Sequence, residues 1–150
     1  MSYKRILVPV DGSAVSDRGL KEALKLARSG ASRLRLFHVV AEYAAYASPE
    51  ATLDLGPILD SLREAGRRTL AKVERRARGT RVRVEAGMAE NPGGRVADTI
   101  VDEAKRWRAD LVVMGTHGRR GVKRMLLGSD AELVIRYCPV PVLLVPGRTR

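Results

Sequence analysis

The stretch Leu111-Val-Val-Met-Gly-Thr-His-Gly118, followed by nine residues and then Gly128-Ser129, decides the fold of this 150-residue chain. Its apolar start has the length of a buried strand, and the residues after Ser129 follow a helical period. Glycines therefore stand where a strand ends and where a helix begins. Backbone amides at such a place can bind phosphates, because no Cβ blocks close approach and a helix N-terminus favours anions. The stretch predicts a nucleotide-binding protein.

In the rest of the chain, apolar runs of strand length alternate with segments of helical period. Other strands are expected at residues 5–10, 34–40, 81–86 and 139–145, and helices at about 14–29, 59–79, 96–107 and 130–137. Residues 41–57 and the stretch Asn91-Pro-Gly-Gly94 are expected to be connections, because proline and glycine gather there.

Strands separated by single helices imply right-handed crossovers and a parallel sheet. We therefore expect a doubly wound, Rossmann-like α/β fold: a five-stranded parallel sheet of order 3-2-1-4-5 with helices on both faces. Such sheets bind ligands beyond the carboxyl ends of the strands where the strand order reverses. Here that place lies between the first strand, which ends at Val10-Asp11, and the fourth, which ends at Met114-Gly115. Topology and the glycine motif thus indicate the same crevice.

Length and composition bound the class of protein. Residues 1–150 are expected to form a single domain, since this length can bury a core without staples. The one cysteine, Cys138, cannot form an internal disulfide, and no signal peptide or membrane span is recognisable, so a cytoplasmic protein with no membrane contact is expected. The net charge of +11 favours anionic partners. Nucleic acid is not expected among them, because few aromatic rings are available to stack on bases.

Two residues of the crevice allow two interpretations each. Ser129-Asp-Ala-Glu132 matches a capping box, so Ser129 either caps the helix or binds phosphate; the adjacent Gly128 favours phosphate. Asp11 either caps the first helix or accepts hydrogen bonds from a ribose or holds a phosphate-bound metal, and its place at a strand end favours the second role. His117 lies in the loop and is a candidate phosphate contact, although a lone loop histidine is more often structural. His38, within a strand, is expected to be a core residue.

The motif Gly115-x-x-Gly118, nine residues, Gly128-Ser129 resembles the ATP-binding signature of the universal stress protein family, G-x-x-G, nine residues, G-(S/T). The opening Ile6-Leu-Val-Pro-Val-Asp-Gly-Ser13, the strand end Phe37-His-Val-Val40 and residues 109–114 and 138–145 are similar to the same family. The resemblance covers nearly the whole chain and points to the ATP-binding subclass.

This resemblance implies a site for ATP, or for ADP or AMP, with Mg²⁺ or Mn²⁺ carried on the phosphates and Asp11 as a potential further contact of the metal. The adenine would lie against Pro9, the backbone of Val39 and Met114, the ribose against Asp11 and Gly115, and the phosphates on the glycine loop and the start of the last helix. The full nucleotide-binding set is Pro9, Val10, Asp11, Val39, Met114, Gly115, His117, Gly118, Gly128, Ser129 and Asp130. The family also implies a homodimer formed by the last strands, here Val140 to Val145.

Two departures from the family pattern qualify this expectation. The stretch from Gly87 to Gly94 is longer and richer in glycine than the usual turn, so the outer wall of the site is expected to differ. Asp130 places a carboxylate beside the phosphates, which favours ADP or AMP over ATP unless a metal or one of the loop cations compensates. Those cations are Arg119, Arg120, Lys123 and Arg124.

The expected function is a nucleotide-binding stress-response or regulatory module with no assigned catalytic residue and at most slow ATP hydrolysis. The chain has no Walker loop, no nucleophile elbow and no recognisable base to activate water. Two alternatives remain at this stage. One is a nucleotidyl-transfer (adenylating) enzyme on a related sheet, and the other is a basic nucleic-acid-binding protein.

Overall fold

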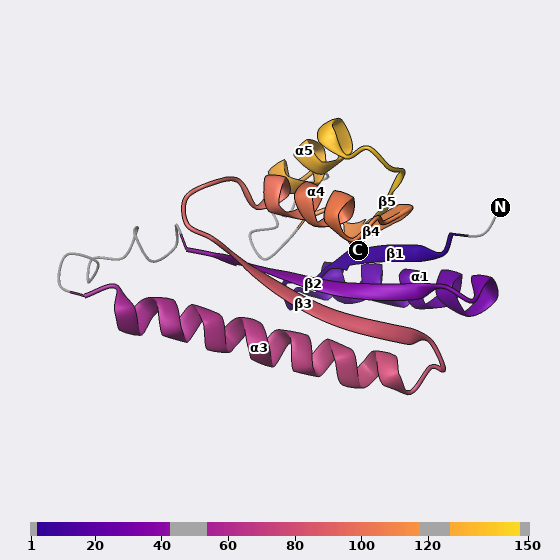
Figure 1. The fold of residues 1–150 in the computed structure, drawn as a ribbon, viewed down its shortest axis with the longest axis horizontal. Coiled ribbons are helices and arrows are strands. Elements are labelled where there is room, and N and C mark those ends of the chain that lie inside the picture. The colour runs from indigo at the N-terminus through magenta and orange to yellow at the C-terminus, as the bar shows by residue number, and fades with distance from the viewer. Residues whose placement is uncertain (1–2, 43–53, 118–126, 148–150) are drawn as a thin grey trace.

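The computed structural model describes residues 3–42, 54–117 and 127–147, in which strands and helices alternate along the chain (Figure 1). The elements are β1 (Arg5–Pro9), α1 (Ala14–Gly30), β2 (Arg33–Ala41), α3 (Gly56–Arg78), β3 (Arg83–Asn91), α4 (Val96–Arg106), β4 (Leu111–Gly115), α5 (Ser129–Tyr137) and β5 (Val142–Val145).

The five strands form one sheet of order β3-β2-β1-β4-β5, and each pair of neighbours is parallel. Helices α1 and α3 pack on one face and α4 and α5 on the other (Figure 1). The predicted doubly wound fold class and strand order are confirmed. All carboxyl ends of the strands consequently lie along one edge of the sheet, and all amino ends along the other.

The central strand β1 is buried on both faces. Ile6 and Val8 belong to the core shared with α1 and α3, whereas Leu7 belongs to the core under α4 and α5, and all three are 0% exposed. Burial of each such side chain contributes about 1.5–3 kcal/mol. An uninterrupted apolar run is what a central parallel strand requires, which explains why this strand was recognisable from sequence.

Strand β3 is longer than predicted and removes most of the expected turn. It pairs with β2 without interruption from Arg83 to Asn91, so the stretch from Gly87 to Asn91 is strand. Gly87 does not form a turn but leaves space for a neighbouring side chain. A Cβ at Gly87 would lie 2.6 Å from Nη2 of Arg35 on the neighbouring strand. The turn begins only after Asn91, whose Oδ1 accepts from the amide of Gly93 at 3.3 Å.

Other boundaries also differ from the sequence expectation. Strand β2 continues to Ala41, and α3 begins at Gly56 because a proline is well tolerated in the first turn of a helix. Strand β5 begins at Val142, since the preceding prolines have no N–H to donate to the ladder. The carbonyl of Pro141 still accepts from the amide of Val112 at 3.0 Å. The expected connection at 43–53 lies outside the described residues.

Helix α3 packs closely on the sheet at Gly66. A Cβ at this position would lie 2.7 Å from Cδ2 of His38 and 3.0 Å from Sδ of Met88. The His38 ring cannot easily move away, because it is 6% exposed and its Nδ1 donates to the carbonyl of Val10 at 2.7 Å. The expectation that His38 is a core residue is confirmed.

We predict that Gly66→Ala lowers the free energy of unfolding by up to about 2 kcal/mol, since overpacking costs about 1–3 kcal/mol and better helix propensity returns about 1. Gly79→Ala is the matched control. Nothing lies within 4 Å of a Cβ at Gly79, whose φ is −68°. The control should change stability by less than about 1 kcal/mol and in the stabilising direction. Urea unfolding measures both, and equal costs would contradict the close packing at Gly66.

Candidate functional site

The first feature of the site is the separation of β1 and β4 at their carboxyl ends. Their ladder runs from Ile6 and Leu111 to Leu7 and Val112, whereas β1 continues to Pro9 and β4 to Gly115. Beyond this ladder β1 pairs only with β2. Two strands whose connections leave toward opposite faces of the sheet diverge where doubly wound proteins hold ligands.

The turn after β1 is held by the Asp11 side chain. Its Oδ1 accepts from the amide of Ser13 at 2.8 Å, and Ser13 is the N-cap of α1, where its Oγ accepts from the amide of Ser16 at 3.1 Å. Gly12 between them has φ 81°, which favours glycine. Of the two roles considered for Asp11, capping of α1 therefore belongs to Ser13. The Asp11 carboxylate is instead held at the end of β1 by its hydrogen bond from the amide of Ser13.

Gly115 has a packing role that the motif alone did not reveal. A Cβ there would lie 2.7 Å from Cγ1 of Val15 and 3.1 Å from its carbonyl oxygen. A Cβ at Gly19, one turn further along α1, would be 3.4 Å from the amide nitrogen of Gly115. The first turns of α1 thus rest directly on the end of β4. Val15 was not recognised from sequence, because an apolar residue in a first helical turn has no distinctive signature.

The two ends of the glycine loop are joined through Thr116. Its amide donates to the carbonyl of Val145 at 3.1 Å, and its carbonyl accepts from the amide of Gly128 at 2.8 Å. Gly128 must be small, because a Cβ would lie 3.1 Å from both the Thr116 oxygen and Cα of His117. The His117 Nδ1 lies 3.0 Å from Oγ1 of Thr116. Sequence reasoning did not select Thr116 for this role, since it acts through its backbone.

Helix α5 starts without the predicted capping box. Gly128 is the N-cap, with no hydrogen bond from a capping side chain, and its carbonyl accepts from the amide of Glu132 at 2.9 Å. The Glu132 side chain pairs one turn forward with Arg136 at 3.1 Å instead of reaching back. Ser129 is consequently the exposed first residue of the helix, and Asp130 follows in its first turn. The capping interpretation of Ser129 is wrong.

The remaining predicted residues divide into three groups. Pro9 and Val39 are partly buried at the ends of β1 and β2, and Met114 is 7% exposed at the end of β4. Val10 is 3% exposed, and its amide and carbonyl already bond Phe37 and His38. Gly118 and the four loop cations lie outside the described residues. The structure therefore brings together the ends of β1 and β4 and the start of α5.

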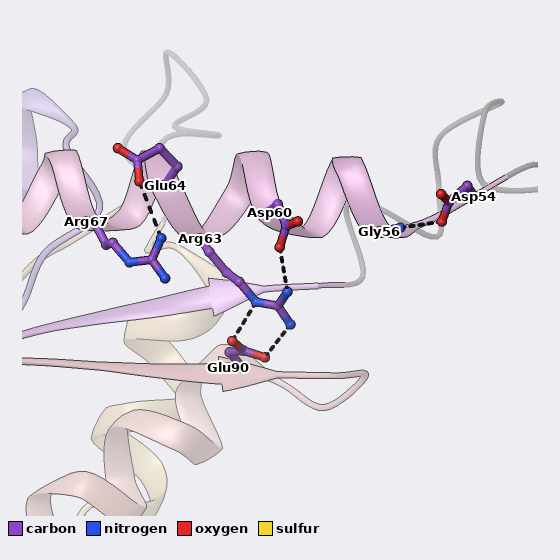
Figure 2. Close-up of polar contacts among 7 residues, drawn as sticks. All are labelled: Asp54, Gly56, Asp60, Arg63, Glu64, Arg67 and Glu90. Atoms are coloured by element: carbon purple, nitrogen blue, oxygen red, sulfur yellow. Dashed lines mark hydrogen bonds and ion pairs between the residues drawn. The ribbon is translucent and has the colours of Figure 1, made fainter.

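A charged cluster, missed from sequence, lies at the carboxyl ends of β2 and β3. Arg63 of α3 binds both carboxylate oxygens of Glu90, with Nε–Oε1 2.7 Å and Nη2–Oε2 3.0 Å, and its Nη1 contacts Asp60 at 3.0 Å (Figure 2). This fork ties α3 to β3 on the β2 side of the candidate site. Arg63 and Glu90 are 27 residues apart, so no local pattern connects them.

Glu42 and Glu90 both belong to this cluster, and their pKa values are shifted in opposite directions. The pKa of Glu42 is raised above its ordinary value of 4.5. The largest cause is the hydrogen bond with Glu90, followed by burial and by repulsion from the Glu90 charge. Hydrogen bonds from Arg63 and Glu42 lower the pKa of Glu90. The Glu42 contribution to stability is therefore present at acidic pH and lost as pH rises through its raised pKa, and the Glu90 contribution is lost as pH falls through its lowered pKa.

We predict that Glu42→Gln stabilises the protein at neutral pH, because an amide can donate to Glu90 without binding a proton and no second carboxylate faces it. The gain should shrink as the pH falls toward 4.5, the ordinary value for this carboxyl. Thermal unfolding from acidic to neutral pH measures this difference. Glu90→Gln is the control and should destabilise at neutral pH, since it breaks the fork with Arg63. A pH-independent gain for Glu42→Gln would contradict the coupling.

Neither a metal-ligand cluster nor a membrane-spanning helix is present in the described part of the chain. Within residues 3–42, 54–117 and 127–147, no three His, Cys, Asp or Glu side chains gather closely enough to hold a metal ion. In the same part of the chain, no helix is both long and apolar enough to span a bilayer.

The strand order, the two helical layers and the loop joined at Thr116 and Gly128 define a protein of the doubly wound α/β class. The model of the universal stress protein family matches residues 2–146, and the chain belongs to this family. The predicted family membership is confirmed.

Relatives and solved structures agree with this assignment. Universal stress protein MJ0531 of Methanocaldococcus jannaschii is 38% identical over 143 residues, covering 95% of this chain and 82% of the relative. The solved structure of MJ0577, from the same organism, has a TM-score of 0.85 at 26% identity and covers 100% of both chains. A universal stress protein family structure from Arabidopsis thaliana with AMP bound has a TM-score of 0.69 over 97% of this chain and 93% of that one, and at 22% identity it shows a shared fold.

Proposed function

We propose that residues 1–150 form one universal stress protein domain that binds an adenine nucleotide at the carboxyl ends of β1 and β4. It would act in the cytoplasm as a stress-response or regulatory module, with at most slow ATP hydrolysis. The observation that carries the proposal is the 2.8 Å hydrogen bond from the amide of Gly128 to the carbonyl of Thr116, which holds the start of α5 beside the end of β4. AMP is bound by a structure of the same fold.

The residues at these ends suit the three parts of a nucleotide. Pro9, Val39 and Met114 supply apolar surface and backbone for an adenine. The Asp11 carboxylate, fixed by the amide of Ser13, can accept from ribose hydroxyls.

For the phosphates, the N-terminus of α5 carries a partial positive charge that favours an anion. Gly118, His117, Gly128, Ser129 and Asp130 complete the proposed phosphate contacts. Asp130 adds a negative charge in the first turn of α5. This charge favours a nucleotide with fewer phosphates.

A divalent cation would reach the site on the nucleotide. Mg²⁺ and Mn²⁺ prefer oxygen ligands, and the Asp11 carboxylate at the end of β1 could supply one. The ion would neutralise phosphate charge that Asp130 otherwise opposes.

We predict that an adenine nucleotide at 100 times its Kd adds about 2.7 kcal/mol to the free energy of unfolding. For a domain of this length the melting temperature should rise by about 5–10 °C. Thermal shifts with ATP, ADP, AMP and GTP, together with mass spectrometry of nucleotide released from the denatured protein, measure binding and preference. The absence of a shift with every adenine nucleotide would end the proposal.

Gly118→Asp should abolish this shift, because its side chain and charge would occupy the phosphate path. Gly93→Asp is the matched control: a Cβ at Gly93 meets nothing within 4 Å, and this turn follows β3 instead of β4. Undiminished affinity in a folded Gly118→Asp variant would place the site elsewhere.

We also propose that the domain forms a homodimer through Val140 to Val145. Strand β5 is at the edge of the sheet, and Leu143 is 39% exposed on it. An apolar edge strand pairs readily with a second copy. Leu143→Asp should convert the dimer to a monomer in sedimentation velocity, whereas Tyr3→Asp, at a similarly exposed residue near the amino edge, should remain dimeric. A monomeric parent protein at micromolar concentration would contradict this assembly.

A further inference from the structure

A basic groove of about 1060 Å³ lies at the opposite end of the strands, along the amino edge of β1, β2 and β3. The turns from α1 into β2 and from α3 into β3 meet at this edge (Figure 1). Six of the 12 described residues that line it are cationic and none is acidic. The cationic residues are Lys4, Arg5, Arg28, Arg33, Arg81 and Arg83.

Three of these arginines form a row across neighbouring strands. Arg5 is in register with Arg33, and Arg33 with Arg83. Parallel neighbours are about 4.8 Å apart and project their side chains from the same face, so three like charges start from adjacent positions. Like charges on neighbouring strands are unfavourable. An anion placed against the row would remove the repulsion.

The next row inward is neutralised, and this one is not. Arg35 forms ion pairs with Glu85 at 3.5 Å and with the buried Glu103. No carboxylate among the described residues forms an ion pair with Arg33 or Arg83. Carboxylates are thus available one row away yet do not compensate the outer arginines.

The first arginine of the row is also incompletely satisfied. Arg5 lies over the Trp107 ring at 4.6 Å, and its Nε is buried without a hydrogen-bond partner in the described structure. The nearby Asp110 carboxylate is engaged by main-chain amides, from Lys4 at 2.7 Å and Arg5 at 3.0 Å. The local carboxylate therefore binds backbone at this edge.

Helix dipoles account for only part of the charge. Arg28 lies in the last turn of α1, where a cation complements the partial negative charge of the C-terminus. Arg33 and Arg83 are in strands, and Arg81 is in the turn that precedes β3. These three have no helix end of their own to compensate.

We propose that this groove binds inorganic polyphosphate. One guanidinium group can donate to two phosphate oxygens at once. An array of guanidinium groups therefore suits a chain that carries a negative charge on every unit. No aromatic residue is among the described residues that line the groove, and the hydroxyls of Ser32 and Thr80 already donate to the carbonyls of Tyr3 and Ala77. The groove thus has charge for phosphates but no ring to stack on a base, which disfavours a single-stranded nucleic acid.

The test compares two double variants of the full chain that lose the same charge. Arg33→Gln with Arg83→Gln removes two of the three arginines of the row. Arg68→Gln with Lys72→Gln removes two exposed cations from the middle of α3, and Arg68 lies about 15 Å along the helix axis from the last residue of α3. Fluorescence anisotropy with labelled long-chain polyphosphate at physiological salt should show at least tenfold weaker binding for the first variant. The α3 variant should bind within about twofold of the parent protein.

Three outcomes would overturn the proposal: no binding by the parent protein, equal weakening in both variants, which indicates diffuse attraction to net charge, or equally tight binding of polyuridylate with the same number of phosphates. Unfolding curves check the fold, and the row variant should be at least as stable as the parent because like charges are removed. Should it unfold, Arg83→Gln alone supplies the same comparison against Lys72→Gln.

Discussion

The positions of the charged groups along β1 follow from one constraint: the central strand must be apolar on both faces. Ile6, Leu7 and Val8 are 0% exposed between two separate cores, and no ionised side chain could replace any of them without a large desolvation cost. Charged groups are therefore found at the two ends of β1. Arg5 is its first residue, and Asp11 follows its last. The length of the strand thus lies between the Asp11 carboxylate and the row of arginines.

The fold could be predicted because its main signals are periodic and local. Apolar runs marked β1 and β4, and single helices between strands fixed the parallel topology. The ends of elements were less predictable, because they depend on contacts between distant residues. Gly87 looked like part of a turn, yet it continues β3 since the side chain of Arg35 crosses it. The early start of α3 at Gly56 instead reflects the tolerance of a first helical turn for proline.

The candidate site was predictable as a location and less so in its contacts. Gly115 and Gly128 were selected as places where a ligand approaches, but in the structure they also admit Val15 and Thr116 at close range. Thr116 acts through its amide and carbonyl, which every residue type shares, so its side chain could not reveal it. Glu132 of the expected capping box instead pairs with Arg136. Both partners of Glu132, the main chain at Ser129 and the side chain of Arg136, are within four residues, so spacing alone could not distinguish the two interactions.

The bond between Thr116 and Gly128 has a consequence for how this family can diversify. It closes the chain around residues 117–127 at the sheet, so the ends of that segment are set independently of what lies between them. Loop-closure entropy grows only logarithmically, and doubling such a length costs about 0.6 kcal/mol. The interval can therefore accept insertions, deletions or wholesale exchange at small thermodynamic cost, provided that the main-chain bond between residues 116 and 128 is kept. Evolution could lengthen or recharge this arm while the domain that carries it stays unchanged.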